Sequence, residues 1–242
     1  MIYLWMAVNI MAVSFGNIEK SKLVDVKINY SIYSEILGEP VQIATLFSEI
    51  KEKVQISNRD CYHLILTVQS SPKIEDFYKF TWEYHSYATC DSLISLRYEK
   101  WIDSNGKKSH MLINFDQDAG LAEYFDDTVI TIPTQTRDFV ALIYGIVNLD
   151  FDQLAVGDSL KSNVLEEDKK RVHVYSTRVR TKENRILKIN RKEFKCLYFE
   201  GLCKANDKKE ETLAKLWVSY YKGKYVPVKI EYGSSKIEII PE

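Results

Sequence analysis

The sequence has little glycine or proline and almost no net charge. Its 242 residues include 9 glycines and 5 prolines, with 45% hydrophobic and 28% charged residues, which excludes a disordered or low-complexity chain. The formal net charge is -1, so no overall field attracts a phosphate backbone, and we expect no nucleic acid as a partner. A chain of this length can bury a core without disulfides or metal ions.

Motifs for catalysis or ligand binding are also absent. There is no Gly-x-Ser-x-Gly elbow, no glycine-rich phosphate loop and no His-Glu-x-x-His. Cys61-Tyr62-His63 is two ligands short of a zinc site, and Asp116 to Gly120 lacks ligands of a calcium loop, which favours a hairpin turn. Asp126-Asp127 and the acids at 166–168 are interpreted as solvated turns. We therefore expect no catalytic residue, no cofactor and no metal.

One long apolar run lies at the start of the chain. Ile2 to Phe15 carries no charge, has the small residues Ala12 and Ser14 near its end, and precedes a polar segment. This layout is typical of a secretory signal peptide at residues 1–16, although no Lys or Arg precedes the run. A membrane anchor is the rival, but the run is shorter than the ~20 residues that cross a bilayer. A buried strand or core helix is the third interpretation.

If the signal is removed, residues 17–242 form a single antiparallel β domain, and the protein is exported to the periplasm or cell envelope. Period-two alternation of apolar and polar residues dominates this part and predicts strands with one buried face. It is clearest at 26–32 and 62–68. Further strands are predicted at 41–56, 81–90, 93–103, 108–116, 171–181, 194–203, 213–221, 225–232 and 235–240, joined by short turns that favour antiparallel pairing.

One helix interrupts the strands. Phe139, Leu142, Ile143 and Ile146 have the spacing of an apolar helical stripe, with Thr136 or Asp138 near the start, and we expect this helix to lie across the sheet. A short helical turn is predicted at 71–78. Residues 166–171, a charged stretch, are predicted to form the most exposed turn of the chain.

Several weak signatures follow one another along the chain: Tyr30 to Tyr33, Ile36 to Leu46, Tyr62 to Pro72, Phe77 to Phe80, Leu96 to Lys100, Phe115 to Asp118, Arg137 to Tyr144, Val156 to Asp158, Phe194 to Leu197, Leu216 to Ser219 and Val226 to Ile230. In this order the sequence, over about Ile28 to Ile240, resembles the bacterial exported proteins of domain of unknown function 3108. The resemblance implies a mainly β fold, a curved antiparallel sheet or half-open barrel similar to periplasmic lipoprotein carriers, with one crossing helix. It implies export but no activity.

Four cysteines in an exported chain raise the question of disulfides. Two bridges among Cys61, Cys90, Cys196 and Cys203 allow three connectivities. Cys196 and Cys203 are seven residues apart and face opposite ways on a regular strand, so they bond only across a bulge or turn. Free buried thiols are the favoured interpretation.

Basic residues gather between Lys169 and Lys192, where Arg178 and Arg180 share a strand face. A cationic surface facing anionic lipid or polysaccharide is one interpretation. A solvated pair of strands, whose charge discourages edge-to-edge aggregation, is the favoured one.

Aromatic residues are the other excess. We expect Trp82, Tyr84, Trp101 and Trp217 to line a concave face of the sheet, although such residues are often simply core. The predicted function is non-enzymatic binding of a lipophilic ligand, such as a lipid or a lipoprotein acyl chain, in the trough of a curled sheet. The alternative is a structural or interaction protein of the envelope that acts through exposed strands or self-association.

Overall fold

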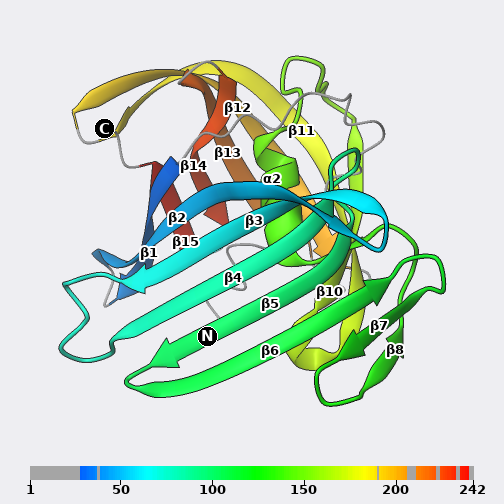
Figure 1. Ribbon diagram of the computed structural model, residues 1–242. Coiled ribbons are helices and arrows are strands. Elements are labelled where there is room, and N and C mark those ends of the chain that lie inside the picture. Colours follow the sequence, from blue (N-terminus) through cyan, green and yellow to red (C-terminus); the bar gives the residue numbers. More distant parts are fainter. Residues whose placement is uncertain are drawn as a thin grey trace.

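A computed structural model describes residues 28–36, 39–189, 191–205, 211–221, 224–232 and 235–239, and most of them lie in strands (Figure 1). The predicted signal peptide lies outside the described residues. The strands are β1 (Ile28–Ile36), β2 (Glu39–Ile56), β3 (Arg59–Ser70), β4 (Phe80–Thr89), β5 (Ser95–Ser104), β6 (Lys107–Asp116), β7 (Leu121–Tyr124), β8 (Val129–Thr131), β9 (Thr136–Arg137), β10 (Ser159–Glu166), β11 (Arg171–Ile189), β12 (Lys192–Ala205), β13 (Thr212–Tyr221), β14 (Lys224–Tyr232) and β15 (Ser235–Ile239). The helices are α2 (Phe139–Val147) and the short 3-10 helix η1 (Glu167–Lys169).

All the described strands belong to one sheet, in the order β8-β7-β6-β5-β4-β3-β2-β1-β15-β14-β13-β12-β11-β10-β9. The first and last strands, β1 and β15, pair in the middle of the sheet. Pairing is antiparallel except between β9 and β10, whose connection carries α2, because parallel strands need a long crossover. Only residues 132–135 join the edge strands β8 and β9, so the sheet curls until its two edges approach each other.

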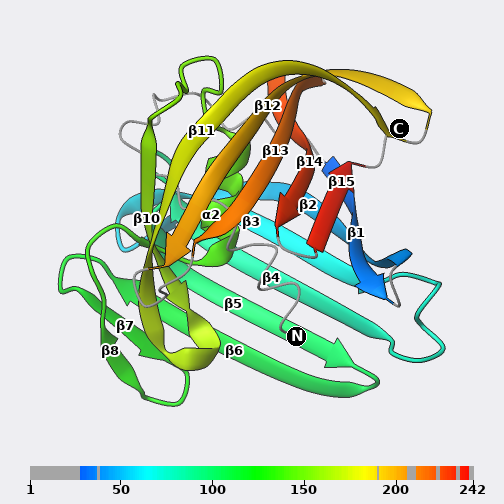
Figure 2. The same cartoon turned by 180° about the vertical axis from the view of Figure 1, so that it is seen from behind.

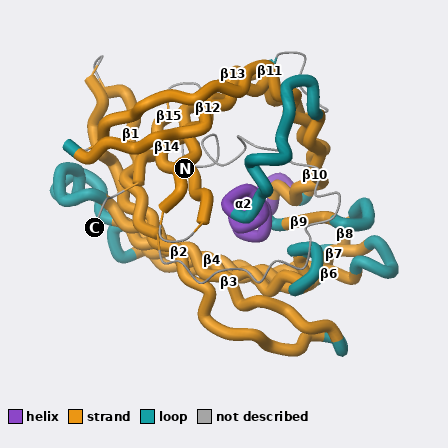
Figure 3. The backbone as a smooth tube through the Cα atoms, turned by 90° about the horizontal axis from the view of Figure 1, so that it is seen from above, coloured by secondary structure: helices purple, strands orange, loops and turns teal. Residues whose placement is uncertain are grey.

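The curl is strengthened by bulges. Register shifts occur between Ile32 and Tyr33, Ile50 and Glu52, Tyr87 and Ala88, Val179 and Thr181, and Trp217 and Val218. An extra residue on one strand bends it and increases its twist. Seen from above, the sheet wraps around α2 (Figure 3). The predicted fold class, a curved antiparallel sheet with one helix across it, is confirmed.

The inner face of the sheet and α2 form the core. Apolar residues at alternate positions of β3 and β4 point inward, and the ring of Tyr84 meets the ring of Phe139 edge-on, with centroids 4.6 Å apart. Tyr144 Oη donates a hydrogen bond of 3.1 Å to the carbonyl oxygen of Ile65, which fixes the helix on β3. The predicted helix is confirmed, and Asp138 is its N-cap, accepting a hydrogen bond of 2.9 Å from the amide of Ala141.

The alternation predicted the long strands well and missed the short ones. The observed bounds differ by a few residues at most strand ends, whereas β11 continues to Ile189, eight residues beyond the prediction. β7, β8, β9 and β10 were not predicted, because three of them have four residues or fewer and β10 has no clean alternation. The predicted helical turn at 71–78 is a run of hydrogen-bonded turns and does not become a helix.

Buried polar side chains join the two ends of the curled sheet, and we call this group the seam: Lys100, Gln117, Arg137, Asp138 and Glu167. Gln117, at the end of β6, donates hydrogen bonds to the carbonyl oxygens of Ser95 and Thr136, at 2.8 and 2.9 Å. Its own oxygen accepts from the amide of Thr136 at 3.2 Å. One amide side chain therefore connects β9 to the opposite half of the sheet.

The next two seam residues lie in β9 and at the start of α2. Arg137 donates to the carbonyl oxygens of Leu93 and Ser92 on the β4–β5 connection, at 3.1 and 2.8 Å. Asp138 accepts from Ser86 Oγ on β4 at 2.6 Å. Burial nevertheless raises the pKa of Asp138 to about 6, because the hydrogen bonds only partly offset the loss of water around the carboxylate. The helix cap is thus also a contact across the seam.

An ion pair completes the seam. Lys100 Nζ on β5 lies 3.1 Å from Glu167 Oε1 on η1, and both side chains are almost wholly buried. Burial raises the pKa of Glu167, although Lys100 works to lower it. The prediction that 166–171 is the most exposed turn, with solvated acids, is wrong for Glu166 and Glu167, which are buried, whereas Asp168, Lys169 and Arg171 are exposed. Glu167 is 2% exposed, because the curl brings this stretch onto the inner face of β5.

We expect the seam ion pair to be sensitive to the loss of one partner. Lys100→Met leaves Glu167 buried without its cation and is expected to lower the free energy of unfolding by about 3–5 kcal/mol. The double variant Lys100→Met, Glu167→Leu is expected to regain most of this loss. Urea denaturation at pH 7 measures both. Lys188→Met, in the exposed pair with Glu193, is the control and should change stability little. Equal losses in Lys100→Met and Lys188→Met would contradict a buried pair.

Candidate functional site

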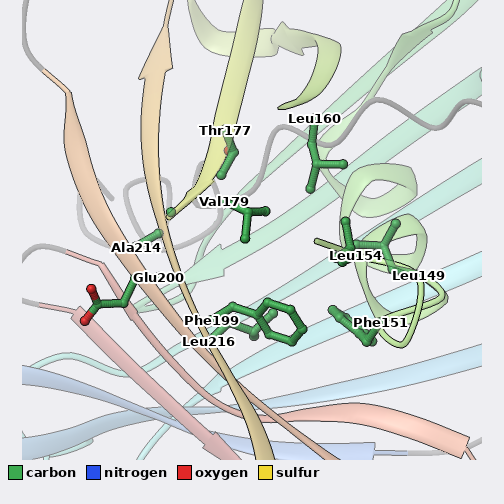
Figure 4. Close-up of a pocket in the computed structure, with 11 residues that line it drawn as sticks. Leu149, Phe151, Leu154, Leu160, Thr177, Val179, Phe199, Glu200, Ala214 and Leu216 are labelled. Carbon is green, nitrogen blue, oxygen red and sulfur yellow. The ribbon is translucent and has the colours of Figure 1, made fainter. Parts of the chain in front are cut away.

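A small apolar cavity lies between the inner face of β10 to β13 and the segment that follows α2 (Figure 4). Its volume is about 30 Å³. The residues that line it are Leu149, Phe151, Leu154, Leu160, Thr177, Val179, Phe199, Glu200, Gly201, Ala214 and Leu216. Its surface is almost entirely carbon, which makes it the candidate site for an apolar group.

Small residues on adjacent strands make the hollow. Gly201 on β12 lies opposite Val179 on β11 and Ala214 on β13. A Cβ atom added at Gly201 would lie 2.7 Å from Thr177 Cγ2, so a glycine is needed for this close approach. Alternation along β12 then puts Phe199 on the same inner face, opposite Leu216.

Phe151 covers the cavity. Its side chain is completely buried, and its ring centroid lies 5.9 Å from that of Phe199. The covering segment, residues 148–158, contains no strand and no helix. Lys182 Nζ holds it in place by donating to the carbonyl oxygens of Asp152 and Leu154, at 2.8 and 2.7 Å. Gly157, at a φ of +99°, turns the segment back toward β10.

The size of the cavity limits what it can hold. A space of about 30 Å³ takes one or two water-sized groups, whereas sites for small molecules usually measure about 300–1,000 Å³. The cavity as it stands is therefore too small for an acyl chain, which would also need the space of the Phe151 ring. The Phe151 ring thus occupies space that a lipophilic ligand would need.

The structure separates the four aromatic residues predicted as a ligand lining. Trp82 and Tyr84 point to the inner face, where both are buried beside the helix and core, and neither lines the cavity. Trp82 Nε1 donates to Ser104 Oγ at 3.2 Å, which satisfies its polar atom. Binding by these two residues stays a prediction.

Trp101 and Trp217 point away from the inner face. Trp101 is about half exposed and stacks on His110 across β5 and β6, with ring centroids 3.7 Å apart. Trp217 follows the cavity-lining Leu216 on β13, so it faces the other way, where Lys229 lies over its ring at 4.6 Å. The four residues thus do not share one concave face. The sequence pattern shows which residues of a strand share a face, but it does not show which face of the sheet becomes concave.

The cavity residues were missed at the sequence level. Phe151, Leu154 and Leu149 lie in a segment with no periodicity, and Gly201 is a glycine inside a strand pattern. Such a glycine indicates a bulge or a close approach of another group, and this was the one available signal.

The pKa values of Glu166 and Glu167 are shifted in opposite directions. Burial raises the pKa of Glu167, whereas hydrogen bonds from Lys169, His173 and Arg171 outweigh burial and lower the pKa of Glu166. Divergent carboxylates of this kind also occur in active sites. Here each one is held by a basic side chain, Lys100 for Glu167 and His173 for Glu166, in contacts that join structural elements.

The outer face carries a pair of hydrogen-bonded imidazoles. His63 Nε2 on β3 lies 2.8 Å from His85 Nδ1 on β4, and His85 Nε2 lies 2.6 Å from Glu83 Oε1. His63 also stacks on the ring of Tyr87, with centroids 4.4 Å apart. Burial, and then the neighbouring His85, lower the pKa of His63. A second proton on the pair would place two N–H groups against each other.

This pair predicts a loss of stability in mild acid. The pKa of His63 is lower in the folded chain than in the unfolded one, so only the unfolded chain takes up this proton as the pH falls below about 6.5. The contribution of His63 to the free energy of unfolding should therefore fall between pH 7.5 and pH 5.5, while Asp138, whose pKa is raised to about 6 in the folded chain, contributes in the opposite direction. In His63→Gln, which keeps a donor for His85, this fall should be smaller. Denaturation at both pH values measures the difference, and an unchanged fall in the variant would refute the role of His63.

The cysteines are free thiols. Cys61, Cys196 and Cys203 are buried, and Cys90 is partly buried. Burial raises the pKa of Cys61, Cys196 and Cys203 to about 11, so these thiols are poor nucleophiles at neutral pH.

Within the described residues, no three His, Cys, Asp or Glu side chains are placed to share a metal ion. Over the same residues, no helix has both the length and the apolar character to cross a bilayer.

The fold and the cavity define a class of protein: a single antiparallel sheet curled around a helix, with an apolar hollow on its inner face. Comparison with family models identifies the family. Residues 29–239 match the family described as "Protein of unknown function (DUF3108)", and the chain belongs to it. The resemblance inferred from the sequence is thereby confirmed.

Two solved structures resemble the chain, each with 7% sequence identity. One is a β-barrel-like protein of domain of unknown function DUF1849 from Brucella abortus, with a TM-score of 0.49, covering 89% of this chain and 96% of that one. The other is a putative lipoprotein from Parabacteroides distasonis, with a TM-score of 0.34, covering 89% of this chain and 94% of that one. No curated protein matches the chain.

Proposed function

We propose that this protein is an exported cell-envelope protein that binds a lipophilic ligand, with an acyl chain as the ligand class, inside its curled sheet. It has no catalytic role in this proposal. The observation that supports it is the apolar cavity beside Phe151, on the inner face of β10 to β13. The leader-like apolar run at residues 2–15 supports export.

The ligand takes the place of the Phe151 ring. The segment that carries Phe151 is held by the buried Phe151 ring, by backbone hydrogen bonds and by the Lys182 side chain, and it belongs to no strand, so it can leave without breaking a strand. An acyl chain that enters replaces one apolar surface by another, and the apolar contacts of Phe199 and Leu216 are kept. The cost is then limited to releasing the segment and ordering the chain.

A non-enzymatic role fits the way the ionisable groups are used. Lys100 and Glu167, and likewise Glu166 and His173, are paired with each other. Asp138 caps α2. None of these residues lines the cavity. The one acid among the lining residues, Glu200, points its carboxylate away from the others (Figure 4) and accepts a hydrogen bond from Tyr198 Oη, so the walls offer a ligand mainly apolar contact.

Phe151→Ala tests the proposal. The variant opens the cavity by the volume of a phenyl ring, and we expect it to lose about 3–5 kcal/mol of stability without ligand. It should bind a fluorescent fatty acid at least tenfold more tightly than the wild type, because no internal ring competes. Fluorescence titration of the chain without residues 1–16 measures the dissociation constant, and unlabelled fatty acid should displace the probe.

Phe115→Ala is the matched control. Phe115 is also buried on the inner face, in β6, but does not line the cavity. This variant should lose stability without gaining affinity. If Phe151→Ala does not fold, Phe151→Leu, a smaller change, is measured instead. A folded variant at Phe151 with no greater affinity than the wild type and Phe115→Ala would refute binding at this site.

A further inference from the structure

The hairpin formed by β11 and β12 projects beyond the rest of the sheet, and we call its end, residues 183–189 and 191–195, the arm. β12 pairs with β13 only from Cys196 to Cys203, and β11 pairs with β10 only up to Arg178. The arm is therefore a two-stranded ribbon. Its yellow ribbon extends past the neighbouring strands in both side views (Figures 1 and 2).

The two faces of the arm differ. Leu187 lies opposite Phe194, and Phe194 is buried on that face. On the other face Ile186 lies opposite Lys195, and Lys188 lies opposite Glu193. Ile186 is 69% exposed, and the lysines on both sides of it are exposed too. This face combines an apolar side chain in water with neighbouring positive charge.

The charge of the arm is opposite to that of the chain. The described part of the arm has two acidic residues, Glu183 and Glu193, whereas the whole chain has a net charge of -1. Its five basic residues are Arg185, Lys188, Arg191, Lys192 and Lys195. The molecule therefore carries an excess of positive charge at one projecting end, which would turn that end toward a negative surface.

The exposed face of the arm continues the face that lines the cavity. Along β11, Lys182 is opposite the cavity-lining Phe199, and Ile186 and Lys188 follow it at alternate positions on the same face. Lys182 is also the side chain that holds the segment covering the cavity. A surface that binds the arm thus lies next to the candidate site.

We propose that the arm docks the protein onto a bilayer of anionic phospholipid. Ile186 enters the boundary between headgroups and acyl chains, while Lys195 extends to the headgroup phosphates beside it. Lys188, which pairs with Glu193 at 2.9 Å, exchanges this exposed ion pair for a headgroup phosphate. Arg191 and Lys192, at the tip, add attraction to the negative surface. This docking goes beyond the proposed function and does not depend on ligand binding in the cavity.

The position of Ile186, more than its exposure, favours docking over simple protection of a strand edge. Lysines alone on a projecting hairpin discourage edge-to-edge pairing and need no partner. Phe77 and Phe125 are also exposed, so an apolar side chain in water is not by itself a signal. Ile186 lies among basic side chains on a projecting ribbon, where apolar insertion and headgroup attraction act on the same face.

Sedimentation with vesicles tests the docking. The chain without residues 1–16 is mixed with vesicles of phosphatidylcholine alone or with 30% phosphatidylglycerol, in low salt and in 0.5 M NaCl. We expect at least tenfold stronger binding to the anionic vesicles in low salt, and a loss of this difference in high salt. Lys188→Glu, Lys195→Glu should weaken binding at least tenfold, and Ile186→Ser should weaken it by a smaller factor that persists in high salt.

Lys107→Glu, Lys108→Glu is the matched control, because it makes the same change in net charge on another exposed hairpin, between β5 and β6. It should leave vesicle binding nearly unchanged. Equal loss in this control, or equal binding of the wild type to both kinds of vesicle, would refute docking by the arm. The comparison of the two vesicle compositions uses only the wild-type chain, so the test stands even where a variant fails to fold.

The same samples distinguish docking of the arm on a membrane from ligand binding in the cavity. A chain that binds anionic vesicles but not the fluorescent fatty acid supports the arm and refutes the cavity. A chain that binds the fatty acid but neither kind of vesicle does the reverse.

Discussion

The two ends of the sheet meet along buried polar side chains, and the shape of the molecule depends on that meeting. Lys100 and Glu167 bring η1 onto the inner face of β5, while Gln117 and Arg137 attach β9 to the opposite half. An apolar contact could join the same elements in several registers. Directed hydrogen bonds and one ion pair permit few arrangements, so the curl has a defined closure, although a buried pair is not by itself evidence of high stability.

The closure also decides what lies inside. Because β9 and β10 are parallel, their connection must cross the sheet, and α2 and the side chain of Phe151 become interior. The helix fills the part of the hollow beside β3 and β4, where it contacts both strands. The segment after the helix, much of which is exposed, reaches the part beside β10 to β13 with Phe151, Leu149 and Leu154, and there a small space remains.

The two faces of the sheet carry different kinds of side chain. The inner face is mostly apolar, and the outer face holds the imidazole pair and stacked aromatic rings such as Trp101 on His110. The arm is where the inner face continues beyond its neighbours and reaches water. The proposed ligand site and the proposed membrane surface are therefore two parts of one strand face, buried at one end and exposed at the other.

The sequence by itself determined the long strands and the helix, because alternation and helical spacing are local and need no knowledge of the partner strand. It left Thr136 and Asp138 both open as the start of the helix, and the order of short signatures indicated the family. It did not determine that Glu167 is buried, that Trp101 faces outward or that Phe151 closes a cavity. These outcomes depend on which face of the sheet becomes concave and on how its ends meet. Only tertiary structure decides both, since bulges, a parallel crossover and polar contacts between distant residues set the direction and extent of the curl.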